Sequence, residues 1–146
     1  MITKGMLTSK RNDWKTPRKL FDELNKEFNF TIDAAADAEN HKCERYYTKK
    51  ENALEKSWKG ERVFLNPPYG RELPKWIKKA AEEAKNKNTI IVMLIPARTD
   101  TKWFHDYIYK KAEIRFIKGR LKFGDGEKDA PFPSMIVIFR RGRNDK

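Results

Sequence analysis

The sequence predicts one α/β domain built on an open, mostly parallel sheet with an antiparallel hairpin at its C-terminal edge. Its 146 residues suit a single domain. Short β-prone runs alternate with helical patterns along the chain, and the last two runs are connected too closely for a helix between them. We place the domain at residues 12–140, between a flexible N-terminal segment at 1–11 and a C-terminal tail at 141–146.

A helix is expected at the start of the domain. Thr16 is a residue type that caps helices, and Pro17 suits the first helical turn. The helical pattern ends near Glu27. Apolar residues at helical spacing mark the side that should be buried: Leu20, Phe21, Leu24 and Phe28.

A short strand follows this helix. Phe30, Thr31 and Ile32 are β-prone, and the run stops at Asp33. Three alanines, 34–36, come next. The pattern therefore predicts a strand, a tight turn and another helix.

The second strand leads into a proline loop and an amphipathic helix. The apolar run 63–65 is halted by Pro67 and Pro68, neither of which can donate to a β-ladder. Beyond the loop, apolar residues recur at helical spacing, with lysines and glutamates on the opposite side. These apolar positions are Leu73, Trp76, Ile77, Ala80 and Ala84.

The remaining elements complete the sheet. The uninterrupted apolar run 90–95 is typical of a central strand that is covered on both faces, and Pro96 ends it. We expect a short helix at 101–109, a strand at 113–117 and a last strand at 135–139. The last two strands should form the antiparallel edge hairpin.

The charge balance favours a polyanionic partner. Thirty-three Lys and Arg against 21 Asp and Glu give a formal net charge of +12, which points to nucleic acid. The longest apolar run is far shorter than the ~20 residues that span a bilayer, so no membrane segment is expected. Residues 1–10 lack the apolar stretch of a secretion signal, and a cytoplasmic location follows. With Cys43 as the single cysteine and two histidines, we expect neither a disulfide nor a metal site.

The tetrad Asn66-Pro67-Pro68-Tyr69 follows the second strand, at the end of a sheet where α/β proteins bind ligands. The Asn66 side-chain oxygen and the Pro67 carbonyl can each accept one N–H of a planar exocyclic amine. Such an arrangement draws the nitrogen toward pyramidal geometry and frees its lone pair. Tyr69 can stack on the base that carries the amine. The alternative is a rigid proline turn with an aromatic cap.

The tetrad resembles the catalytic motif of amino-methyltransferases that use S-adenosylmethionine. Over residues 12–140 the chain resembles the small phage-type DNA N6-adenine methyltransferase family. The segments that match are Asp13-Trp14-Lys15-Thr16-Pro17, Asp33-Ala34-Ala35-Ala36-Asp37 with Asn40, Asn66-Pro67-Pro68-Tyr69, Pro96-Ala97-Arg98-Thr99-Asp100-Thr101 and Gly119-Arg120-Leu121-Lys122-Phe123. The resemblance implies a Rossmann-like methyltransferase fold. It also implies site-specific methylation of adenine N6 in DNA, in a bacterial cell and in a phage, prophage or restriction-modification setting.

The resemblance further implies a set of site residues. The catalytic residues would be Asn66, Pro67, Pro68 and Tyr69. Contacts to S-adenosylmethionine would come from Trp14, Thr16, Pro17, Asp33, Ala34, Ala35, Asn52 and Asn66. Substrate contacts would come from Tyr69, Arg98 and Phe123.

Structural alternatives stand beside these roles. Asp33 can be a strand-end or helix-cap residue, and Thr16 with Pro17 can be an ordinary helix start. Arg98 can form a surface ion pair, and Phe123 can be a core residue of an edge strand. Basic pairs such as Arg18/Lys19 and Lys78/Lys79 can converge on one DNA-binding surface or lie apart.

Two other functions are compatible with the sequence. One is methylation of a glutamine amide in a protein, because that amide is also planar, although the positive charge favours DNA. The other is a non-catalytic nucleic-acid-binding relative of the same fold. A homodimer that embraces a duplex also suits so small a domain.

Overall fold

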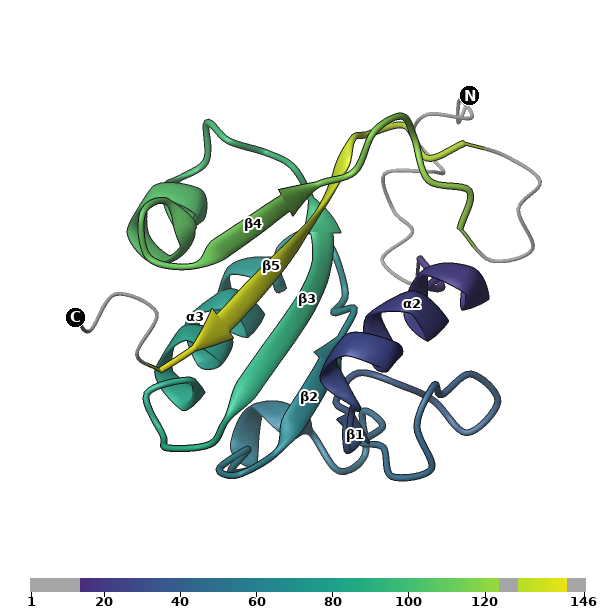
Figure 1. Ribbon diagram of the computed structural model, residues 1–146, viewed down its shortest axis with the longest axis vertical. Helices are drawn as coiled ribbons and strands as arrows, with labels where there is room; N and C mark the ends of the chain where they lie inside the picture. The colour runs from purple at the N-terminus through teal and green to yellow at the C-terminus, as the bar shows by residue number, and fades with distance from the viewer. Residues whose placement is uncertain (1–13, 124–128, 142–146) are drawn as a thin grey trace.

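Five strands form one mixed sheet in the computed structural model, which describes residues 14–123 and 129–141 (Figure 1). The strand order is β1–β2–β3–β5–β4. Three parallel strands come first along the sheet: β1 (Ile32–Asp33), β2 (Arg62–Leu65) and β3 (Ile90–Pro96). β5 (Ser134–Arg140) is antiparallel both to β3 and to the edge strand β4 (Glu113–Phe116). The α/β class, the parallel strands and the C-terminal edge hairpin predicted from the sequence are confirmed.

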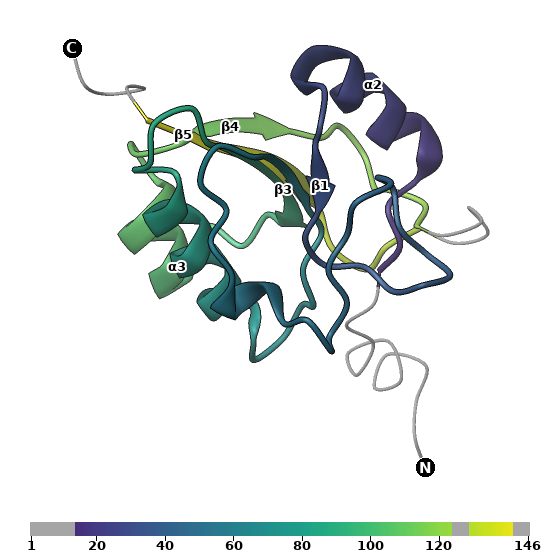
Figure 2. The same cartoon turned by 90° about the horizontal axis from the view of Figure 1, so that it is seen from below.

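Helices cover both faces of this sheet (Figure 2). α2 (Arg18–Phe28) packs on one face, where the Phe21 ring meets the Phe64 ring of β2 edge to face at 5.0 Å between centroids. α3 (Leu73–Glu83) and η2 (Phe104–Ile108) contact each other on the opposite face. β3 lies between these layers, and its residues 91–95 have no exposed surface, as the sequence predicts for a central strand.

The start of α2 differs from the prediction. Pro17 is the N-cap residue, and no side chain caps the helix, so the expectation that Thr16 is the cap is wrong. The reason is that the Thr16 hydroxyl oxygen accepts a hydrogen bond from Asn66 instead. The helix ends at Phe28, because Asn29 adopts the left-handed conformation at φ 53°.

The helix expected after the three alanines is absent, since residues 34–52 contain none. The Asp33 carboxylate accepts hydrogen bonds from the backbone N–H groups of Ala35 and Lys42, which folds the segment back on itself. Asp33 also forms an isolated parallel bridge with Tyr46. These contacts satisfy the backbone without a helix, and the next helical turn is η1 (Ala53–Glu55).

The helix predicted at 101–109 is present in a wider form. η2 is a π-helix, in which the Tyr109 N–H donates to the Phe104 carbonyl five residues earlier at 2.8 Å. Within the described ranges 14–123 and 129–141, no helix is both long and apolar enough to cross a membrane. The predicted segment 1–11 and the tail from 142 onward lie outside the described residues.

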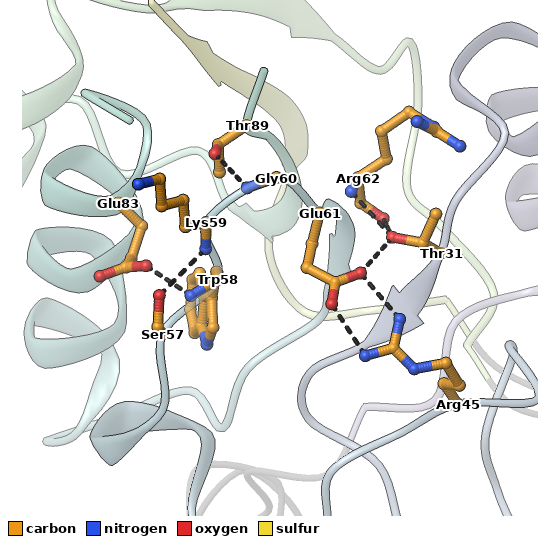
Figure 3. A network of polar contacts seen from close by, with 10 residues as sticks. All are labelled: Thr31, Arg45, Ser57, Trp58, Lys59, Gly60, Glu61, Arg62, Glu83 and Thr89. Carbon is orange, nitrogen blue, oxygen red and sulfur yellow. Dashed lines mark hydrogen bonds and ion pairs between the residues drawn. The ribbon is translucent and has the colours of Figure 1, made fainter. Parts of the chain in front are cut away.

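The edge of the sheet where β1, β2 and β3 begin, which we call the amino edge, holds a polar network (Figure 3). The Glu61 carboxylate accepts both guanidinium hydrogen bonds of Arg45, at 2.9 and 2.8 Å, and the Thr31 hydroxyl at 2.7 Å. The Thr89 hydroxyl oxygen accepts the Gly60 N–H at 2.8 Å. Each of these side chains is thus bonded to another part of the same edge.

Candidate active site

The opposite edge, where β1, β2 and β3 end, gathers the residues singled out from the sequence; we call it the carboxyl edge. Asp33 is the last residue of β1, Asn66 follows β2 directly, and Arg98 comes two residues after β3. Because β5 runs the other way, its first residue, Ser134, also lies at this edge, opposite Pro96. Chain segments far apart in the sequence therefore meet where the fold predicts a ligand site.

The side chain of Asn66 is fixed by two hydrogen bonds. Its Nδ2 donates to the Trp14 carbonyl and to Thr16 Oγ1, the latter at 2.9 Å. A backbone carbonyl can only accept, so the amide nitrogen must point toward Trp14. The Asn66 Oδ1 is buried and has no donor among the described residues. The geometry thus uses both amide donors and leaves a buried acceptor without a partner.

Pro67 and Pro68 add further hydrogen-bond acceptors next to Asn66. Pro67 is buried and Pro68 is partly buried, directly after the end of β2. Neither has an N–H, so the segment adds carbonyl oxygens and no backbone donors. Within the part of the chain that the structure describes, the Pro67 carbonyl accepts no hydrogen bond. Asn66 Oδ1 and the Pro67 carbonyl are therefore two neighbouring acceptors that have no donor among the described residues.

Tyr69 lies deeper than the sequence predicts for a residue that stacks on a base. Its side chain is 4% exposed, and its hydroxyl donates to the Leu94 carbonyl at 2.8 Å. Burial raises the pKa of this phenol well above its usual value. Stacking on a base requires the Tyr69 ring to become more exposed than it is in this structure.

The Tyr69 ring belongs to an aromatic cluster formed with Trp14, Phe123 and Phe132. Trp14 contacts both phenylalanines edge to face, each at 5.4 Å between centroids. Tyr69 lies 5.7 Å from Phe132 and 6.5 Å from Phe123. Phe123 is buried in the hydrophobic core, as the alternative to a substrate contact expects, but it lies beyond the end of β4 and not within the edge strand. The structure brings Trp14, Tyr69 and Phe123 together, as a shared site requires.

Phe132 was missed by the sequence analysis. It stands between Pro131 and Pro133, directly before the strand that begins at Ser134. An antiparallel last strand begins at the carboxyl edge, so an aromatic residue just before it is placed beside the site. That combination of strand direction and position is the signal that would have identified it.

Asp33 is a buried carboxylate at the end of β1. Its side-chain oxygens accept the Ala35 N–H at 3.3 Å and the Lys42 N–H at 2.8 Å. Burial raises the pKa of Asp33 to about 6, against the lowering effect of those hydrogen bonds and of Lys42 and His41 nearby. The Asp33 carboxylate forms no ion pair within residues 14–123 and 129–141. A positively charged ligand at this position would favour its ionised form.

The other predicted contacts are placed as follows. Ala34 is buried beside Asp33, and Pro17 forms the N-cap of α2 next to Thr16. Asn52 precedes η1 in the left-handed conformation at φ 55°, and no hydrogen bond joins its side chain to the described parts of the site. The Arg98 side chain is exposed. It forms no ion pair with the described residues, so the surface ion pair considered as an alternative role for Arg98 is not found there.

The basic pairs do not all converge. Arg18 and Lys19 begin α2 on one face of the sheet, whereas Lys78 and Lys79 lie on α3, which covers the other face. Lys79 is also engaged with Glu83 at 3.3 Å. A DNA surface that includes both pairs would have to extend around the sheet.

Comparison with known proteins identifies relatives of the whole described domain. A model of the family "DNA N-6-adenine-methyltransferase (Dam)" matches residues 4–146. The "DNA N-6-adenine-methyltransferase" of Haemophilus phage HP1 (strain HP1c1) is 30% identical over 148 aligned positions, covering 95% of this chain and 85% of the relative. The protein of the same name from Escherichia phage T1 is 39% identical over 113 residues, covering 76% of this chain and 47% of the relative.

A third relative matches over a shorter length. The "Putative methyltransferase YfdM" of Escherichia coli (strain K12) is 39% identical over 66 residues, which cover 40% of this chain and 71% of that protein. The match to the phage T1 relative spans about half the length of that protein.

Proposed function

The chain belongs to the DNA N-6-adenine-methyltransferase (Dam) family, and from this premise we propose that it methylates adenine N6 in DNA with Asn66 holding the target amine. The family and both phage relatives carry the name of this reaction. Methylation of a protein glutamine and a non-catalytic role, the two alternatives from the sequence, are not favoured by these relatives.

The observation that carries the proposal is the Asn66 Oδ1 atom, which is buried and has no donor within residues 14–123 and 129–141. Leaving such an acceptor unsatisfied costs about 1–3 kcal/mol, a cost that an N–H of the bound adenine removes. The Pro67 carbonyl accepts the second N–H. Two acceptors on the amine favour a pyramidal nitrogen with an available lone pair.

Asp33 and its neighbours fit S-adenosylmethionine as the methyl donor. When bound, this cofactor supplies a methyl group on a positively charged sulfur, which the amine nitrogen accepts. The Asp33 carboxylate is buried at the adjacent strand end, where a cationic ligand offsets the cost of its burial. The proposed contacts from the α2 start and the β1 end are Trp14, Pro17, Ala34 and Ala35, with Asn52 from the segment before η1. The Thr16 hydroxyl is bonded to Asn66 Nδ2 in this structure.

Asn66 acts by orientation and not as a base. A neutral amide takes no proton, and the methylated amine is acidic enough to release its surplus proton to water. The work of the site is therefore to align the amine and keep its lone pair available.

The DNA contacts follow from the same arrangement. Adenine N6 is inside the stack of a duplex, so the base must leave it, and aromatic side chains recover part of the unstacking cost. Tyr69 and Phe123 belong to the aromatic cluster at the site. Arg98 is exposed at the carboxyl edge, where it can contact a phosphate. The homodimer stays a prediction.

The test is to identify the product and to remove the acceptor. Purified protein is incubated with labelled S-adenosylmethionine and mixed DNA, and the modified nucleoside is identified by mass spectrometry. We expect N6-methyladenine from the natural protein. Asn66→Ala should lower kcat by about 100-fold or more, the scale of removing one preorganised polar group from an active site. The variant should remain folded and should still bind S-adenosylmethionine.

Two outcomes would contradict the proposal. Turnover by Asn66→Ala at the natural rate would remove Asn66 from the mechanism. If the natural protein leaves adenine N6 of the DNA unlabelled, adenine is not the methyl acceptor.

A further inference from the structure

We propose that Thr16 is a positioning residue for the reaction: together with the Trp14 carbonyl it holds the Asn66 amide so that Oδ1 faces the target amine. The inference rests on the proposed role of Asn66 and adds a residue to it. Thr16 reaches Asn66 across 50 positions of sequence, from the segment that precedes α2.

The nitrogen of the Asn66 amide is hydrogen-bonded within the protein, whereas its oxygen has no donor among the described residues. Thr16 is 5% exposed, and its Oγ1 accepts one N–H of Asn66 at 2.9 Å. The Trp14 carbonyl accepts the other N–H. The oxygen on the opposite side of the amide is the buried atom that has no donor among the described residues.

An asparagine amide needs such a holder because its last torsion is soft and nearly two-fold. Rotation by half a turn would exchange oxygen and nitrogen, and the amide would then present donors to an amine that also donates. Here a rotated amide would set Oδ1 against the Trp14 carbonyl, so two acceptors would face each other. The Trp14 carbonyl thereby selects which way the amide points, and Thr16 fixes the plane in which it lies.

Two other roles for Thr16 make different predictions. A helix cap is excluded by the structure, because no side chain caps α2. A direct contact to S-adenosylmethionine, as the sequence suggests, would place the effect of a substitution on the cofactor dissociation constant. A positioning role places the effect on kcat.

The experiment compares Thr16→Val with Thr16→Ser in the full chain. Valine keeps the shape of threonine and lacks the acceptor, whereas serine keeps the acceptor. We expect Thr16→Val to lower kcat by about 3- to 10-fold, the equivalent of one neutral hydrogen bond. Its dissociation constant for S-adenosylmethionine should stay within about twofold of the natural value, less than the loss of a hydrogen bond to the cofactor would cause. Thr16→Ser should restore kcat.

The outcomes separate this inference from the proposed function. An unchanged kcat in Thr16→Val, or a loss confined to cofactor binding, would overturn the role of Thr16 even when Asn66→Ala is inactive. Full activity of Asn66→Ala would instead overturn the proposed function itself.

A measurement on the natural protein covers the case in which Thr16→Val folds poorly. The side-chain N–H signals of Asn66 are assigned by their loss from the ¹⁵N spectrum of Asn66→Ala. We expect them to exchange with solvent more slowly than those of the exposed Asn29. Equal exchange at the two residues would contradict a held amide.

Discussion

Polar side chains at the amino edge are paired with one another, whereas two side-chain oxygens at the carboxyl edge are buried without a partner among the described residues. Glu61 binds Arg45 and Thr31 at the amino edge (Figure 3). At the carboxyl edge, Asn66 Oδ1 and Ser134 Oγ have no hydrogen-bond partner among the described residues. Unsatisfied buried atoms are uncommon in folded proteins and call for an explanation. This difference is what we expect if a ligand completes the bonds of the carboxyl edge, as proposed above.

The pKa values of carboxylates at the two edges are shifted in opposite directions. Bidentate hydrogen bonds from Arg45 hold the pKa of Glu61 below its usual value. Arg115 does the same for Glu113, where β4 begins. At the other edge, burial raises the pKa of Asp33 to about 6. The amino edge therefore favours charged carboxylates, and the carboxyl edge disfavours one.

The largest effect on stability expected from this contrast is a pH dependence due to Asp33. Its folded pKa, about 6, lies above the ordinary value of 3.8, so the folded state binds the proton more tightly than the unfolded state. This contribution is complete below about pH 4 and is lost as the pH rises through about 6, for a change of at most about 3 kcal/mol. Urea unfolding of the natural protein and of Asp33→Asn, from pH 4 to pH 7, measures it.

The sign is checked by a matched variant at the amino edge. The folded pKa of Glu61 is lowered, so its contribution to stability is present above the ordinary pKa and is lost as the pH falls. The stability advantage of the natural protein should therefore decrease with rising pH relative to Asp33→Asn and increase relative to Glu61→Gln. A pH-independent difference for Asp33→Asn would show that its carboxyl is not perturbed.

Removing the Glu61 side chain should affect stability and spare activity. Glu61→Ala deprives Arg45 and Thr31 of their acceptor; with Arg45 largely exposed to solvent, we expect a loss of about 1–2 kcal/mol in the free energy of unfolding. The kcat of the folded protein should not change, because Glu61 is at the edge opposite the site. A fall in kcat larger than the loss of folded protein would contradict the claim that the amino edge contributes to stability and not to activity.

Arg98 should give the smallest effect. Arg98→Ala is expected to weaken DNA binding by about 3- to 5-fold at low salt and to reduce the slope of log K against log salt by about one. Lys59→Ala, which removes an exposed cation near the amino edge, is the control and should leave both quantities unchanged. Equal effects of the two substitutions on DNA affinity would indicate that DNA does not bind preferentially at the carboxyl edge.

Periodicity made most of the fold predictable. The buried positions of α2 and α3 repeat at helical spacing, and the apolar run of β3 reads as a central strand. The place of Asn66 was also predictable, because prolines directly after an apolar run end a strand there. Local patterns of this kind indicate which face of a single helix or strand is buried and where that element ends.

Contacts between distant segments were not predictable in the same way. Thr16 followed by Pro17 is a standard helix start, and nothing local indicates that its hydroxyl oxygen binds Asn66 instead. The alanines after Asp33 suit a helix, but hydrogen bonds from Ala35 and Lys42 to the Asp33 carboxylate favour a loop. In both cases one polar side chain, bonded across the site, overrides the local preference.

The most direct test is the structure of the protein with DNA and a cofactor analogue that cannot donate a methyl group. We expect the adenine N6 atom within hydrogen-bond distance of Asn66 Oδ1, while Asn66 Nδ2 stays bonded to the Trp14 carbonyl and Thr16. A reversed amide, or a backbone N–H of the protein bonded to Oδ1 in that complex, would contradict the account.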